Sequence, residues 1–70
     1  MKYYINKNQQ DSTGNNHEIH KETCRYLPKP ENRIYLGDFS NSYEALIAAR
    51  KYYPYTADGC IHCCLEIHTK

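Results

Sequence analysis

Cys60-Ile61-His62-Cys63, followed at once by Cys64, is the most informative segment of this 70-residue chain. A Cys-x-x-Cys turn lets two thiolates converge on one metal ion, and this spacing is typical of zinc sites. Earlier in the chain, His20 and Cys24 form a second ligand-like pair, with three residues between them. The four side chains His20, Cys24, Cys60 and Cys63 therefore predict one tetrahedral Zn²⁺ site that joins two distant segments.

Three neighbouring residues compete with the predicted ligands. His17, three residues before His20, could replace it as the ligand, and so could His68 from the tail. An odd separation puts His17 and His20 on opposite faces of an extended segment, so we expect only one of them to reach the metal. Cys64 is expected to be a small buried hydrophobic residue, with substitution for Cys63 as the alternative.

The chain is too short to build a large hydrophobic core. Its 70 residues fall below the usual size of one domain, so we expect a single domain over residues 1–70. A core of this size rarely contributes more than ~3–5 kcal/mol, whereas structural zinc in finger peptides binds with roughly 10–16 kcal/mol. Metal binding and folding are therefore expected to be coupled.

Charge and hydropathy exclude several classes of protein. Nine Lys and Arg against eight Asp and Glu give a net charge of +1, which by itself indicates no polyanionic partner. The N-terminal residues contain no apolar signal-peptide region, and no apolar run approaches the ~20 residues of a membrane span. We expect a cytoplasmic monomer with no membrane association, in a reducing compartment that disfavours structural disulfides.

Strand and turn signals surround the two ligand pairs. Residues 3–5, 17–20 and 33–39 have strand composition. The polar stretch 6–16 reads as an exposed loop, and residues 55–59 read as a turn. In the third strand, Ile34 and Leu36 are expected on one face, with Tyr35 on the other.

The clearest helix signal starts near Asn41. Asn41-x-x-Glu44 resembles a capping box, and Pro54 forbids a helix beyond about residue 53. Helical spacing predicts an apolar stripe toward the sheet, formed by Tyr43, Leu46, Ile47, Arg50 and Tyr53. A further short helix could begin at residue 65. The predicted fold class is α+β: a short antiparallel sheet packed on one main helix, with a Cys-x-x-Cys knuckle.

The order His-x3-Cys-Arg-Tyr-Leu, a strand, an Ala-rich helix and Gly-Cys-x-x-Cys resembles the Ada-type metal-binding domain family. That family includes small Cys/His modules attached to some bacterial nucleases and short stand-alone bacterial proteins. Over residues 19–63 the resemblance implies a compact α/β fold with one zinc ion bound by His20, Cys24, Cys60 and Cys63.

The chain departs from the family pattern in two places. The family's DNA-repair member has an all-Cys site in which one thiolate accepts a methyl group, whereas His20 stands at the first matching position here. The family's basic, aromatic segment before the last Cys pair is replaced by residues 53–59, which contain an acid and no base. The resemblance therefore implies a zinc site without methyl transfer and weakens any inherited DNA binding.

The first functional hypothesis is a non-enzymatic, zinc-stabilised module that binds another macromolecule, protein or nucleic acid. Four protein ligands leave no position on the ion for water or substrate. Basic side chains near the knuckle could hold phosphates, and aromatic side chains could stack on nucleobases. The residues concerned are Arg25, Tyr26, Lys29, Arg33 and Tyr35. The simpler interpretation is an ordinary solvated face, because Glu18, Glu22 and Glu31 balance these charges.

The alternative hypothesis is a thiol redox protein or a metal-dependent enzyme that uses Cys60 and Cys63. A redox dithiol needs its first Cys at a helix N-terminus, where the thiol pKa falls, and a loop precedes Cys60 here. Zinc hydrolases carry a general base beside an open metal position, and the sequence contains no His-Glu-x-x-His motif. We therefore predict that the protein is not an enzyme.

Overall fold

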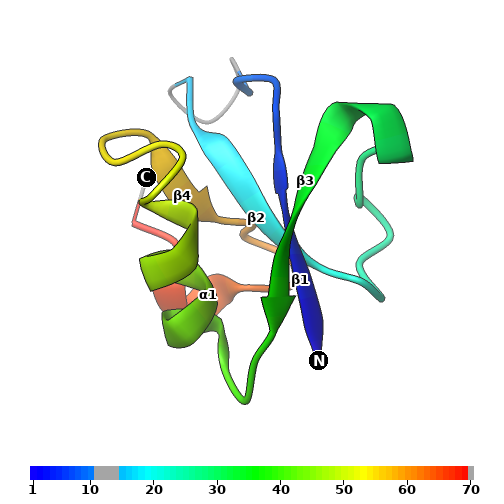
Figure 1. Ribbon diagram of the computed structural model, residues 1–70, viewed down its shortest axis with the longest axis vertical. Coiled ribbons are helices and arrows are strands. Elements are labelled where there is room, and N and C mark those ends of the chain that lie inside the picture. Colours follow the sequence, from blue (N-terminus) through cyan, green and yellow to red (C-terminus); the bar gives the residue numbers. More distant parts are fainter. Residues whose placement is uncertain (11–14, 70) are drawn as a thin grey trace.

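The structure is a computed structural model that describes residues 1–10 and 15–69 (Figure 1). Its elements are the strands β1 (Lys2–Asn6), β2 (His17–Lys21), β3 (Arg33–Asp38) and β4 (Ala57–Gly59), the helix α1 (Ser42–Ala49), and the short 3-10 helices η2 (Pro30–Asn32) and η3 (Leu65–Ile67). The four strands form one sheet, and α1 lies on one side of it (Figure 1). The predicted α+β class is confirmed.

The sheet has the strand order β3-β1-β2-β4 and is mixed. Strand β1 is antiparallel to both β2 and β3, as predicted. Strand β4 runs parallel to β2, so the prediction of a wholly antiparallel sheet is wrong at this edge. The chain leaves β2 and returns only after β3 and α1, and a long crossover of this kind brings a strand back in the same direction.

Strand β4 occupies residues that the sequence pattern assigned to a turn. Ala57, Asp58 and Gly59 have low β propensity, but they pair with His17, Glu18 and Ile19 respectively. Pairing with a neighbouring strand overrides local preference here. The consequence for the site is direct, because Cys60 follows β4 and His20 follows Ile19.

The hydrophobic core lies between the sheet and α1. The antiparallel register places Ile5 opposite Ile19, and both side chains are fully buried. The buried core cluster is small; it consists of Tyr3, Ile5, Ile19, Ala45, Ala49, Cys64 and Ile67. Its size agrees with the limited burial expected of so short a chain.

Helix α1 begins as the sequence predicts. The Asn41 side chain accepts a hydrogen bond from the Glu44 backbone N–H at 3.1 Å. The Glu44 carboxylate in turn accepts one from the Ser40 backbone N–H at 3.0 Å, one residue earlier than in a standard capping box. The helix ends at Ala49, earlier than predicted, and continues as turns to Tyr52.

The buried face of α1 differs from the predicted stripe. Its buried residues are Ser42, Ala45 and Ala49, whereas Tyr43, Ile47 and Arg50 are exposed. Leu46 and Tyr53 are the members of the predicted stripe that pack against the core. Small side chains let the helix axis approach the sheet closely, and this close approach leaves no space for the larger ones on that face.

Strand β3 has the predicted faces. Ile34 and Leu36 pack against the core, and Tyr35 lies on the outer face with its ring centroid 5.3 Å from that of Tyr4. In the stretch predicted as an exposed loop, Asn6 and Asn16 are instead buried. Residues 11–14 of that stretch lie outside the described residues.

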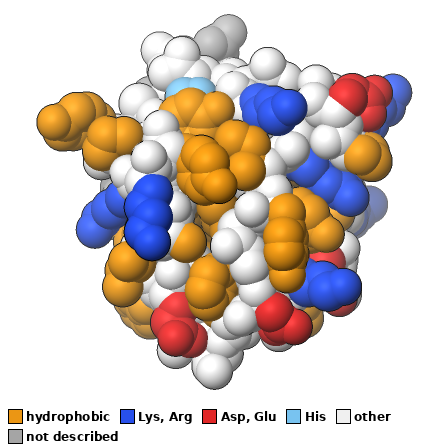
Figure 2. All heavy atoms as spheres, in the orientation of Figure 1, with side chains coloured by type: hydrophobic (Ala, Val, Ile, Leu, Met, Phe, Trp, Pro, Cys, Tyr) orange, Lys and Arg blue, Asp and Glu red, His pale blue; other side chains and the backbone are white. Residues whose placement is uncertain are grey.

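Several large hydrophobic side chains remain on the surface. Figure 2 shows hydrophobic groups spread among Lys, Arg, Asp and Glu side chains on one face of the molecule. The exposed set includes Tyr43, Ile47, Tyr52 and Tyr55. Within residues 1–10 and 15–69, no helix has both the length and the apolar composition needed to cross a membrane.

Candidate metal centre

The four predicted ligands lie close together at the ends of two strands and in the turns that follow them. His20 is on β2, and Cys24 is in the turn that follows that strand; Cys60 comes directly after β4, and Cys63 is in the next turn. The ligand atoms of these four residues all lie within 4.8 Å of one another. The sulfurs of Cys24 and Cys60 are 4.0 Å apart, close to the roughly 3.8 Å that tetrahedral Zn–S bonds of ~2.3 Å require.

Backbone hydrogen bonds hold both turns in register with the sheet. The Cys60 N–H donates to the Ile19 carbonyl at 3.0 Å, which fixes Cys60 beside His20. The Cys64 N–H donates to the Cys60 carbonyl at 2.8 Å, and the Cys24 N–H donates to the Lys21 carbonyl at 3.0 Å. The parallel pairing of β2 with β4 therefore brings the two ligand pairs next to each other.

Backbone N–H groups also point at two of the sulfurs. The Lys21 N–H lies 3.4 Å from the Cys63 sulfur, and the Tyr26 N–H lies 3.4 Å from the Cys24 sulfur. Hydrogen bonds to the charged form of a group favour that form. These contacts suit thiolates, which are the form of Cys that binds metal.

The buried position of the polar His20 side chain is unusual. Only 1 % of the residue is exposed, and neither ring nitrogen has a hydrogen-bond partner among the described residues. Leaving a buried polar group unpaired costs about 1–3 kcal/mol. Burial, followed by the nearby His62, lowers the pKa of His20 to about 4. The ring is therefore neutral at pH 7, as metal ligation requires.

The three thiols are held in surroundings that oppose ionisation. Burial raises the pKa of Cys60 to about 12 and also raises the pKa of Cys24. The contact with the Cys64 thiol, together with burial, raises the pKa of Cys63. A divalent cation supplies the missing positive charge, and a coordinated thiol is deprotonated outright. The donor set of one nitrogen and three sulfurs fits a structural zinc ion.

The competing histidines have other partners. His17 lies on the helix side of the sheet, stacked on Tyr53 with ring centroids 3.6 Å apart, and its Nδ1 lies 2.7 Å from the Thr56 hydroxyl. His68 Nδ1 lies 2.9 Å from the Gly59 carbonyl oxygen. Neither belongs to the four-residue cluster. The predicted opposite orientation of His17 and His20 is confirmed.

Cys64 and His62 flank the cluster without joining it. Cys64 is fully buried in the hydrophobic core, as expected, although its sulfur lies 3.7 Å from that of Cys63. His62 is exposed and stacks on Tyr26, with ring centroids 4.5 Å apart. The sequence pattern did not predict this ring contact.

The predicted macromolecule-contact residues fall into two groups. Arg25 and Tyr26 lie together next to Cys24, with the Arg25 guanidinium carbon 5.7 Å from the Tyr26 ring centroid, and Lys29 is exposed in the same loop. On the outer face of the sheet, Arg33 and Tyr35 both pack on Tyr4.

Arg33 is already engaged within the protein. Its Nη1 donates to the Pro28 carbonyl at 2.9 Å, and its guanidinium carbon lies 4.4 Å from the Tyr4 ring centroid. The Arg25, Tyr26 and Lys29 side chains are more accessible than that of Arg33.

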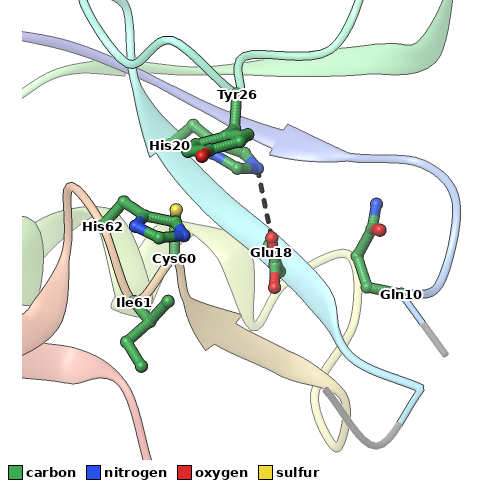
Figure 3. Close-up of a pocket in the computed structure, with 7 residues that line it drawn as sticks. All are labelled: Gln10, Glu18, His20, Tyr26, Cys60, Ile61 and His62. Atoms are coloured by element: carbon green, nitrogen blue, oxygen red, sulfur yellow. Dashed lines mark ion pairs between the residues drawn. The ribbon is translucent and has the colours of Figure 1, made fainter. Parts of the chain in front are cut away.

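A pocket of about 290 Å³ opens beside the cluster (Figure 3). His20 and Cys60 line it together with Glu18, Tyr26 and His62. The Glu18 carboxylate lies 3.6 Å from His20 Nε2. Sequence reasoning treated Glu18 only as a balancing charge. Its position two residues before His20 on a strand signals that the two side chains share a face, because alternate residues do, but it does not show which ring nitrogen the carboxylate meets.

No protein-family model, curated protein or solved structure matches this chain. The resemblance to Ada-type domains therefore rests on the spacing of the His and Cys residues and on the sequence around them. The fold and the site define a small α+β protein with a His/Cys cluster that can hold a metal ion.

Proposed function

We propose that this protein is a zinc-stabilised binding module without enzymatic activity, in which His20, Cys24, Cys60 and Cys63 bind one Zn²⁺. The supporting observation is that their four ligand atoms lie within 4.8 Å of one another. One imidazole and three thiolates favour zinc over harder ions. The ion would join the turn after β2 to the turn after β4 at the β4 edge of the sheet.

The chemistry of the site supports a structural role. Four protein ligands complete the tetrahedral shell of zinc and leave no open position for a reacting group. Burial raises the pKa of Cys60, whereas a redox-active first Cys needs a lowered pKa. Cys60 also precedes an isolated turn rather than a helix. The thiol redox and metalloenzyme hypotheses have no comparable support.

The proposed partner is a macromolecule, protein or nucleic acid, that contacts the loop beside the zinc ion. Arg25, Tyr26 and Lys29 are exposed there, and Tyr26 is 52 % accessible. A basic side chain beside an exposed aromatic ring suits contacts with phosphate and with stacked nucleobases. In this proposal the protein is an Ada-like module of bacterial type that acts as a monomer in the cytoplasm.

Native mass spectrometry combined with thiol alkylation tests the zinc site. We expect one Zn²⁺ per chain, with Cys24, Cys60 and Cys63 protected from alkylation until a chelator removes the ion. A chain that carries no metal and whose thiols react at once, without unfolding, would contradict the proposal.

Oligonucleotide binding at several salt concentrations tests the nucleic-acid form of the partner proposal. We expect affinity to fall as salt rises, and Arg25→Ala or Lys29→Ala to weaken binding. Lys51→Ala is the matched control, because Lys51 is an exposed base that follows α1. Undetectable binding at low ionic strength would reject nucleic acid as the partner.

A further inference from the structure

Glu18 stands next to the proposed zinc site but is not one of its ligands. It lies two residues before His20 on β2, so both side chains project from the same face of the strand. The Glu18 side chain is only 14 % exposed, although carboxylates are seldom buried without a partner. Its Oε1 lies 3.6 Å from His20 Nε2. The carboxylate thus faces one nitrogen of the ring.

An imidazole that binds a metal uses one nitrogen and carries a proton on the other. A metal-bound His almost always donates that second N–H to a carboxylate or a carbonyl, which fixes the tautomer and the ring orientation. Because Nε2 of His20 faces Glu18, Nδ1 is the nitrogen left for the metal. In Figure 3 a dashed line joins one nitrogen of the His20 ring to the Glu18 carboxylate.

We infer that His20 binds the zinc ion through Nδ1 and donates its Nε2–H to the Glu18 carboxylate, which makes Glu18 a positioning residue of the site. This inference rests on the proposed zinc-binding function. The 3.6 Å separation is longer than a good hydrogen bond, so a small rotation of the Glu18 side chain completes the contact.

The carboxylate has two effects that can be separated. It accepts the Nε2–H, which orients the ring, and its negative charge makes the imidazole a stronger ligand. Glu18→Gln keeps an acceptor oxygen of similar size and removes the charge, whereas Glu18→Ala removes both. We expect zinc affinity to decrease in the order wild type, Glu18→Gln, Glu18→Ala, with a loss of about 10- to 100-fold for Glu18→Ala.

Zinc competition titrations with a chromophoric chelator measure this order. Glu22→Ala is the matched control, because Glu22 is an exposed acid near the ligands and its removal changes the net charge equally. We expect Glu22→Ala to retain the wild-type affinity. Equal losses for Glu18→Ala and Glu22→Ala would show a general charge effect and overturn the inference.

Long-range proton–nitrogen NMR of the zinc-loaded protein tests the tautomer directly. We expect the His20 proton on Nε2 and the metal on Nδ1, and the Nε2–H resonance to shift in Glu18→Gln. A merely structural role of Glu18 would leave this resonance unchanged. A proton on Nδ1 with zinc on Nε2 would overturn the inference but leave the zinc site intact, whereas a chain that binds no zinc would overturn the proposed function itself.

Discussion

At the scale of single residues, His20 shows how the site depends on its surroundings. Its ring is buried, neutral and without a hydrogen-bond partner among the described residues, and it lies beside three thiols. A core His is ordinarily hydrogen bonded, as His17 is to Thr56 on the opposite face of the same strand. The contrast between these two histidines supports metal ligation by His20.

Two cysteine substitutions distinguish a ligand from a core residue. Cys60→Ser is expected to weaken zinc binding by about 100- to 1,000-fold, since roughly 10–16 kcal/mol is shared among four ligands. Cys64→Ala is expected to keep one zinc per chain and to lose about 1 kcal/mol of stability through a small cavity. Chelator competition and urea unfolding measure the two effects. Loss of zinc in Cys64→Ala would show that the ligand set is wrong.

His17 predicts part of the response to acid. Burial lowers the pKa of His17, so the unfolded chain takes up a proton at a higher pH than the folded protein does. The folded state therefore loses stability as the pH falls below the ordinary His pKa of about 6.5. His17→Phe keeps a ring against Tyr53 and removes the titration.

Urea unfolding of the zinc-loaded protein measures the contribution of His17 to stability. The unfolding is carried out at pH 7 and at pH 5.5, which lie on either side of the ordinary His pKa of about 6.5. We expect the unfolding free energy of wild type to fall more steeply with decreasing pH than that of His17→Phe. Zinc release by acid affects both proteins, so the difference in slope reports His17. Identical slopes would contradict the prediction.

At the scale of elements, the short strand β4 has the largest effect on the site. Its parallel pairing with β2 ends at Gly59 opposite Ile19, and the next residues along the two strands are Cys60 and His20. Strand β4 also packs against the C-terminal turn that contains Cys64 and Ile67. A Cβ atom at Gly59 would lie 2.5 Å from the Cys64 carbonyl oxygen and 2.5 Å from Ile67 Cγ1.

Gly59→Ala is therefore expected to destabilise the zinc-loaded protein by about 1–3 kcal/mol, because backbone atoms must move to make room. Chemical denaturation measures the loss. Ser40→Ala, which alters an exposed side chain before α1, serves as the control and is expected to have little effect. A Gly59→Ala protein as stable as wild type would show that the approach of these segments is not tight.

At the scale of the whole molecule, a small core is combined with a site that joins distant segments. The buried hydrophobic cluster contains few large side chains, among them Ile5, Ile19 and Tyr3. The His/Cys cluster brings residues 20–24 next to residues 60–63, which lie on either side of β3 and α1 in the sequence. One bound ion would restrain most of the chain between them.

Removal of zinc is expected to unfold the protein. A chelator at neutral pH, or mild acid that protonates the ligands, should abolish the cooperative thermal transition seen by circular dichroism. Readdition of Zn²⁺ should restore it, and Mg²⁺, which prefers oxygen ligands, should not. The same spectrum and melting temperature with and without zinc would contradict the coupling of folding to metal binding.

Several local features of this protein can be predicted from short stretches of its sequence. Strand composition located three strands, the Asn41 and Glu44 pair located the start of α1, and two short spacings selected His20, Cys24, Cys60 and Cys63 as candidate ligands. These features depend on residues near one another in the chain, so they can be read from spacing and propensity. That the four residues bind zinc stays a prediction.

The direction of β4, the buried face of α1 and the orientation of the His20 ring depend on how the folded segments pack together. Residues 57–59 are a strand because β2 offers them an edge, and α1 buries Ala45 and Ala49 because it packs closely on the sheet. Alternation along β2 puts Glu18 and His20 on one face, but the nitrogen that faces the carboxylate depends on the rotation of the His20 ring. Each of these results comes from packing between segments that are distant in sequence or from the direction of a side chain, and local spacing encodes neither.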